Sequence, residues 1–144
     1  QAGGAVEVFA FDSAPCRSLA TPRPVSWGKQ RLEIDRGPEH AGHAYWLSGS
    51  LRGTAHGIPY RGTRIPLDLD PYFVALVRRP NTGLFTNNLG VLDARGRASL
   101  VLEVPPELLL HYSGTALHHA FVEFGPHGFE HVSNAVTFRF WILH

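Results

Sequence analysis

NAVTFRFWIL, at residues 134–143, is the stretch that decides the fold class of this chain. Val136, Phe138, Phe140 and Ile142 alternate there with Thr137, Arg139 and Trp141. A period of two built from β-branched and aromatic residues is typical of a strand with one buried face. A strand so near the end of the sequence is expected to close a compact sheet or to pair with a neighbouring molecule.

Similar short segments recur along the chain between turn-forming residues. The segments that we interpret as strands are 5–11, 30–35, 43–51, 98–104 and 117–124, with a short strand within 84–92, a terminal pair of strands completed by 129–143, and a hairpin turn at 93–97. Residues 72–77 are compatible with a strand or a helix, and 105–110 with one helical turn. About eight or nine short strands with no sustained helical period predict an all-β fold, an antiparallel sandwich of Ig-like or jelly-roll-like type.

Two segments rich in helix and strand breakers separate these strands. Residues 13–27 contain three prolines and are expected to form a connector or an edge segment, because proline has no N–H to donate to a sheet. Residues 52–71 contain glycine and proline at short intervals and predict a long irregular connection. Long connections of this kind are often functional.

Length and composition restrict the class of protein. The chain has 144 residues, which fits one domain with an N-terminal strand and connector at 1–28 and a module core at 29–144. Its 15 Gly and 11 Pro, with only 17% charged residues, favour a turn-rich β protein. A formal net charge of +1 is too small for a nucleic-acid partner. No stretch approaches the roughly 20 apolar residues of a membrane span.

Cysteine usage does not fix the redox compartment of this chain, whereas the first residue suggests a location. Cys16 is the single cysteine, so it forms either a buried apolar thiol or an intermolecular link. The sequence begins with Gln1 rather than Met. This fits a mature protein whose export signal has been removed, and a trimmed sequence would look the same.

Nine histidines are the most prominent chemical feature. His40, His43, His118 and His119 are candidate metal ligands, because their strands can be neighbours and imidazole is a common ligand. Adjacent strand residues point to opposite faces, so His118 and His119 do not easily serve one ion. With no H-x-H pair or HExxH helix, structural or surface histidines are the preferred interpretation, and no cofactor is predicted.

Acidic and hydroxyl groups provide weaker patterns. Asp68 and Asp70 could supply oxygen ligands to calcium, but the further positions of a calcium loop are missing, which favours a solvated turn. Ser48 and Ser50 lie in S-G-S and not in the G-x-S-x-G of an α/β esterase. No catalytic residue is assigned.

Aromatic residues suggest a binding surface instead. Tyr60, Tyr72, Trp46 and Trp141 could form a platform on which sugar rings stack. The alternative is that most of them belong to the core or to sheet faces. Tyr60 and Tyr72, in or beside the Gly/Pro-rich connection, are least explained by a core.

Several short motifs resemble an uncharacterised extracellular β-sandwich module of secreted planctomycete and myxobacterial proteins. They are Gly37-Pro38-Glu39-His40-Ala41-Gly42, Tyr45-Trp46-Leu47-Ser48-Gly49-Ser50, Gly53-Thr54, Ile65-Pro66-Leu67-Asp68-Leu69-Asp70-Pro71-Tyr72, Asn88-Leu89-Gly90-Val91-Leu92-Asp93, Gly96-Arg97-Ala98, Leu117-His118-His119-Ala120-Phe121-Val122 and Ser133-Asn134-Ala135-Val136. The resemblance covers roughly residues 30 to 143. It implies export and a β-sandwich, and it carries over no catalytic residues.

The strand outside this resemblance shapes the functional expectation. Its apolar residues are Val6, Val8, Phe9 and Phe11, which would be costly to leave in water. We expect a non-enzymatic, extracellular or cell-surface structural protein that assembles with copies of itself into a homo-oligomer or polymer, such as a filament, sheath or surface layer, by strand addition. A carbohydrate-binding module with a polysaccharide partner is the alternative, and a hydrolase ranks third.

Overall fold

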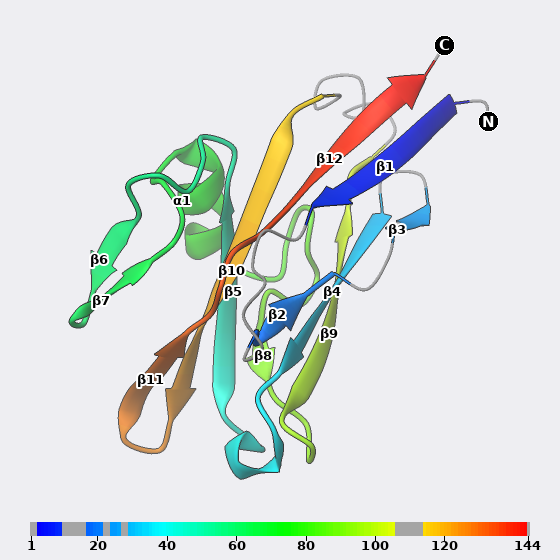
Figure 1. Ribbon diagram of the computed structural model, residues 1–144. Helices are drawn as coiled ribbons and strands as arrows, with labels where there is room; N and C mark the ends of the chain where they lie inside the picture. Colours follow the sequence, from blue (N-terminus) through cyan, green and yellow to red (C-terminus); the bar gives the residue numbers. More distant parts are fainter. Residues whose placement is uncertain (1–2, 10–16, 22–23, 27–28, 106–113, 144) are drawn as a thin grey trace.

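The computed structural model describes residues 3–9, 17–21, 24–26, 29–105 and 114–143 (Figure 1). The described strands are β1 (Gly3–Phe9), β2 (Leu19–Ala20), β3 (Pro24–Ser26), β4 (Lys29–Asp35), β5 (Ala44–Ser50), β6 (Ile58–Tyr60), β7 (Thr63–Ile65), β8 (Leu89–Val91), β9 (Arg97–Glu103), β10 (Ala116–Gly125), β11 (Gly128–Val132) and β12 (Val136–Leu143). A 3-10 helix η1 (Pro38–His40) and an α-helix α1 (Pro71–Arg78) complete the elements.

The strands form two main antiparallel sheets, which confirms the predicted all-β sandwich. The larger sheet has the order β1-β12-β10-β5-β8, and β11 also pairs with β10. In the smaller sheet, β4 pairs with β2, β3 and β9. Strands β6 and β7 form a separate hairpin. Figure 1 shows the two sheets side by side, with α1 and the β6–β7 hairpin on the far side of the larger one.

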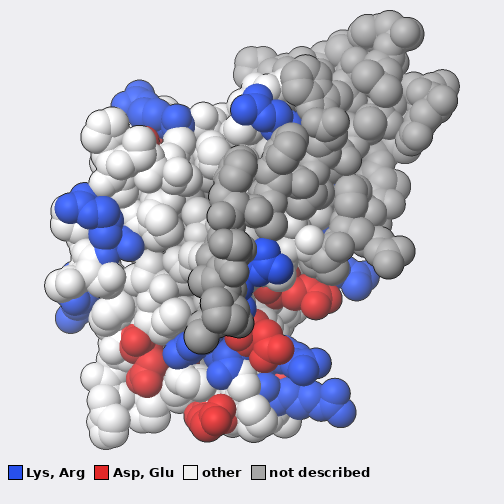
Figure 2. Space-filling model, viewed as in Figure 1, with Lys and Arg blue, Asp and Glu red and all other residues white. Residues whose placement is uncertain are grey.

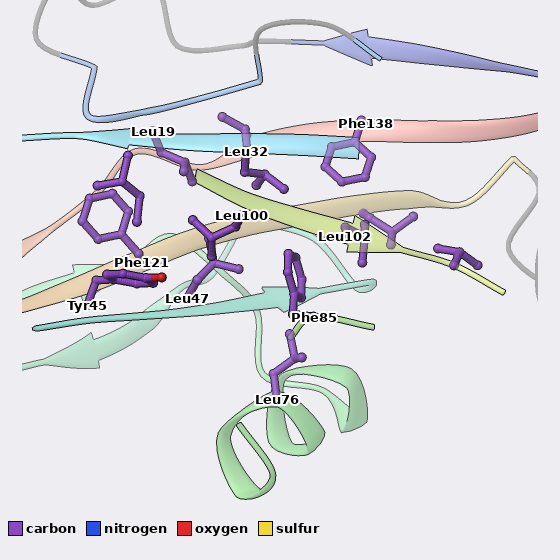
Figure 3. Close-up of a cluster of buried hydrophobic side chains, with 14 of the residues drawn as sticks. Leu19, Leu32, Tyr45, Leu47, Leu76, Phe85, Leu100, Leu102, Phe121 and Phe138 are labelled. Atoms are coloured by element: carbon purple, nitrogen blue, oxygen red, sulfur yellow. The ribbon is translucent and has the colours of Figure 1, made fainter. Parts of the chain in front are cut away.

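The main core lies between the two sheets (Figure 3). In β4, buried and exposed residues alternate as the sequence predicts, and Leu32 and Ile34 point inward. Other fully buried side chains of this core are Leu19, Leu47, Phe85, Leu100, Leu102, Leu117, Phe121, Val136 and Phe138. Each such side chain stabilises the fold by about 1.5–3 kcal/mol relative to exposure to water.

A second apolar cluster covers the opposite face of the larger sheet. It contains Ile65, Leu67, Phe73, Ala120 and Val122. Strand β10 therefore contributes to both clusters and is buried on both faces, which explains why its sequence does not alternate cleanly.

Helix α1 resolves the ambiguity of residues 72–77. Pro71 lies in the first turn, where its missing N–H costs nothing, and the Asp70 side chain caps the helix by accepting from Phe73 N at 2.9 Å. Leu76 then reaches the main core.

Two connections differ from expectation. The segment 52–71 is not wholly irregular, because it contains the β6–β7 hairpin. The turn at 93–97 exists, but the hairpin prediction is wrong: β8 pairs with β5 and β9 pairs with β4, so the turn crosses between sheets. Alternation within a strand does not reveal its partner.

Some predictions fall outside the described residues. They concern Phe11, Cys16 and most of the predicted helical turn at 105–110.

The C-terminal strand β12 is an inner strand of the larger sheet. It lies between β1 and β10, and β1 takes the edge position by pairing with β12 from Gly3↔Leu143 to Phe9↔Thr137. Val136 and Phe138 are fully buried, and Thr137 on the other face is only 4% exposed. The start of β12 is therefore buried on both faces rather than one. In the described part of the chain, no helix has the length and apolar character needed to cross a membrane.

Candidate functional site

A buried carboxylate marks one end of the sandwich. Glu123 lies near the end of β10, faces the same side as Phe121, and is 0% exposed. Its register partners are Tyr45 on β5 and His131 on β11. The pairing with β11 shifts register directly after Glu123, and such bulges are common where a sheet aims a side chain at a functional site.

Three side chains converge on this carboxylate. Nδ1 of His40 lies 2.6 Å and Nδ1 of His43 lies 2.5 Å from Glu123 Oε2, while Arg36 Nε donates to Oε1 at 2.5 Å. Burial raises the pKa of Glu123, but the hydrogen bonds from His43, Arg36 and His40 together hold that pKa below its usual value. The carboxylate is therefore ionised, and both imidazoles donate to it through Nδ1–H.

Local sequence places the two histidines on a tight loop after β4. Gly37 adopts a left-handed φ of 89°, and Pro38 begins η1. His40 N donates to Gly37 O at 3.0 Å, and His43 N donates to His40 O at 3.1 Å. The loop is tied to the segment after β8, because Leu92 N donates to His43 O at 2.8 Å.

The other predicted histidine pair lies elsewhere on β10. His119 is fully buried in the main core, with Nε2 2.7 Å from the Tyr72 hydroxyl and its ring stacked on Phe138. Burial, and then the neighbouring His118, lower the pKa of His119 to about 3. His118 Nδ1 lies 2.6 Å from Thr137 Oγ1 instead. The structure thus joins His40 to His43 but not to His118 and His119.

Sequence reasoning missed two members of the cluster, Arg36 and Glu123. A usable signal existed for one of them, since Glu123 interrupts the apolar run Phe121-Val122-Glu123-Phe124. A charged residue inside a buried strand needs partners. Arg36 lies 87 positions before Glu123 in the sequence, and no feature of its local sequence indicates that it binds a buried carboxylate.

The acidic pair considered for calcium organises the 52–71 connection. Asp70 Oδ2 accepts from Leu51 N at 2.7 Å and Arg52 N at 3.1 Å, in addition to the helix cap by Oδ1. Asp68 Oδ1 accepts from His56 N and Gly57 N. The hydrogen bond from Gly57, followed by contributions from His56, lowers the pKa of Asp68 although burial opposes the shift. Both residues are buried and their carboxylates bind the loop's own backbone, so the prediction of a solvated turn is wrong.

The candidate aromatic platform is divided between the two clusters. Tyr72 packs against the main core, whereas Trp46 and Tyr60 pack against the second cluster. The Tyr60 ring meets Phe129 edge-on with centroids 5.3 Å apart. The side chain of Trp141 lies outside the described part of the chain. These contacts account for the three described aromatics by packing.

The two edges of the larger sheet differ. On β8, the Asn81 side chain accepts from Leu89 N at 2.9 Å and donates to Leu89 O at 3.1 Å, so an amide occupies both edge groups of that residue. On the opposite edge, β12 is the strand to which β1 is hydrogen-bonded in the described sheets. In Figure 2, acidic and basic side chains lie interspersed in the lower part of the view.

No protein-family model, curated protein or solved structure matches this chain.

Proposed function

We propose that this chain is a non-enzymatic structural subunit of an extracellular or cell-surface assembly, and that copies associate along the outer edge of β1. The observation that carries the proposal is the position of β1 at the end of the six-stranded sheet, paired over seven residues with β12. An edge strand presents a row of N–H and C=O groups to which a strand of another molecule can add.

The contrast with the opposite edge supports this choice. Proteins usually protect edge strands against unwanted pairing. At β8 the Asn81 side chain takes the place of a neighbouring strand at Leu89. β8 is also only three residues long, whereas β1 has seven residues. The long edge is therefore the better surface for strand addition.

The proposed location rests on the resemblance of the sequence motifs to a module of secreted proteins, which implies an exported chain. The resemblance spans roughly residues 30 to 143. Strand β1 lies outside it, although the remaining strands already form two packed sheets. An added apolar strand with Val6, Val8 and Phe9 is consistent with a function beyond folding of the module.

The test uses two adjacent proline substitutions, Glu7→Pro and Val8→Pro, in the full chain. Successive N–H groups along a strand point to opposite sides, so one of these residues directs its N–H to β12 and the other directs it outward. Proline at the inward position should lower the thermal stability, and proline at the outward position should leave it nearly unchanged. The pair thus serves as its own matched control.

Sedimentation velocity of untagged protein over a wide concentration range provides the measurement. Wild type should form species that are multiples of 15.9 kDa, and the stable proline variant should remain a monomer. A wild-type protein that stays monomeric at millimolar concentration, or a stable variant that assembles normally, would contradict the proposal. The carbohydrate-binding alternative stays a second-ranked prediction, tested by pull-down on insoluble polysaccharides.

A further inference from the structure

We propose that His40, His43 and Glu123 bind a divalent transition-metal ion of the zinc class through Nδ1 of each imidazole and Oε2 of the carboxylate. These ligand atoms all lie within 4.8 Å of one another. The site goes beyond the proposed assembly function and does not depend on it.

The distances are close to those that coordination requires. Zinc binds imidazole nitrogen and carboxylate oxygen at about 2.0–2.2 Å, so two ligand atoms of a tetrahedral site are roughly 3.4 Å apart. The two nitrogens now lie 2.6 Å and 2.5 Å from Oε2. Each separation has to grow by only about 0.8–0.9 Å, which small rotations of partly exposed side chains provide.

The Glu123 carboxylate is preorganised to bind a metal ion through Oε2 alone. Glu123 is held by β10 between its neighbouring strands, and Arg36 Nε binds Oε1 from one side. Outer hydrogen bonds that orient a ligand in this way are a regular feature of metal sites. Arg36 therefore leaves Oε2 directed at the two imidazoles.

Backbone contacts fix the loop that carries the histidines. The donations from His43 N to His40 O and from Leu92 N to His43 O set the spacing of the two residues. Gly125 provides room for the second imidazole, because a Cβ at that position would lie 3.1 Å from His43 Cε1 and 3.4 Å from Nδ1. The loop and the β10 end thus shape a cradle around the ligand atoms.

Exposure defines the direction of access. The side chains of His40 and His43 are 20% and 14% exposed, whereas Glu123 is 0% exposed. An ion therefore reaches the site from the histidine side. Three protein ligands leave one tetrahedral position for water or a small ligand, as in sites where zinc is accessible.

The donor set selects the metal class. Two imidazoles and one carboxylate suit zinc, cobalt, nickel or copper, whereas calcium and magnesium prefer oxygen ligands only. Arg36 already compensates the Glu123 charge, which lowers affinity below that of an otherwise unpaired carboxylate. Metal binding also places the imidazole proton on Nε2, so the 3.5 Å contact between His40 Nε2 and Arg36 Nη2 has to open.

The experiment titrates the full chain, first stripped with a chelator, with Co²⁺ and then Zn²⁺. Cobalt should bind one ion per chain with visible d–d absorption, and zinc should displace it. At a zinc concentration 100 times the dissociation constant, the melting temperature should rise by about 5 to 10 °C. His40→Ala and His43→Ala should each weaken zinc binding at least tenfold. The matched control is His56→Ala, since the His56 side chain is 89% exposed and contacts Asp68, away from the cluster.

Both histidine variants are checked for folding by circular dichroism without metal, and the partly exposed positions of these residues make a folded product expected. If the variants do not fold, chemical modification of wild-type histidines in the presence and absence of zinc gives the second readout, with His40 and His43 protected by the ion. No stoichiometric cobalt binding, equal affinity in wild type and His43→Ala, or an equal loss in His56→Ala would overturn the proposal.

Discussion

Acid should destabilise this protein through one buried histidine, and replacing it should remove that sensitivity. His119 is 0% exposed, and burial, together with His118, lowers its pKa from the ordinary 6.5 to about 3. The unfolded chain therefore binds this proton more readily than the folded chain. The free energy of unfolding therefore decreases as the pH falls from about 6.5 to about 3.

The magnitude follows from the two pKa values. Each pKa unit corresponds to about 1.36 kcal/mol, and pH 4.5 lies two units below the ordinary histidine pKa. His119 alone should thus reduce the free energy of unfolding by about 2.7 kcal/mol between pH 7.5 and 4.5. Burial also lowers the pKa values of His118 and His131, which act in the same direction as His119. The contribution of His131, which is not among the causes of the His119 shift, cancels when variants are compared.

The perturbation is His119→Leu. It removes the hydrogen bond to the Tyr72 hydroxyl, which costs about 1 kcal/mol, and it replaces a buried Nδ1 that has no hydrogen-bond partner among the described residues. At pH 7.5 the variant should therefore be slightly less stable than wild type. At pH 4.5 the difference should reverse, because the variant lacks the buried titrating group and the loss of about 2.7 kcal/mol in wild type exceeds the cost of about 1 kcal/mol of the substitution.

Equilibrium urea unfolding at pH 7.5 and 4.5, followed by tryptophan fluorescence, measures the effect. The exposed turn residue His127 supplies the control His127→Gln, which should lose the same free energy as wild type on acidification. An equal loss in wild type and His119→Leu would refute the reasoning, since it would show that His119 is not held neutral by burial.

Three further outcomes are expected. Asp70→Ala should lower the free energy of unfolding by about 2–4 kcal/mol, measured by urea unfolding, because one carboxylate caps α1 and binds the backbone after β5; an effect no larger than that of Asp93→Ala at an exposed turn would contradict this role. Gly49→Ala should cost about 1–3 kcal/mol in thermal unfolding, since a Cβ there would lie 2.6 Å from atoms of His119 and Tyr72; an unchanged melting temperature would be inconsistent with that packing. Far-UV circular dichroism should be sheet-dominated, and a helical content above about a third would be incompatible with the fold.

The strands whose two faces differ in polarity were predictable from sequence. β4 alternates apolar and polar residues because one face meets the core and the other meets water, and the structure has the same alternation. The helix α1 was only half predictable. Its apolar run suits either element, whereas Asp70 directly before Pro71 is a local signal for a helix start, because the capping hydrogen bond from Phe73 N spans only three residues.

Local sequence by itself determined the all-β class, most strand positions and the turns, because alternation and turn chemistry act between residues close in the chain. Tertiary structure decided which strands pair. It sent β8 and β9 to different sheets and placed β12 between β1 and β10. It also created the cluster of Arg36, His43 and Glu123, whose members are up to 87 positions apart. Long-range register brings such groups together, and it depends on the complementary faces of the whole sandwich rather than on any local pattern.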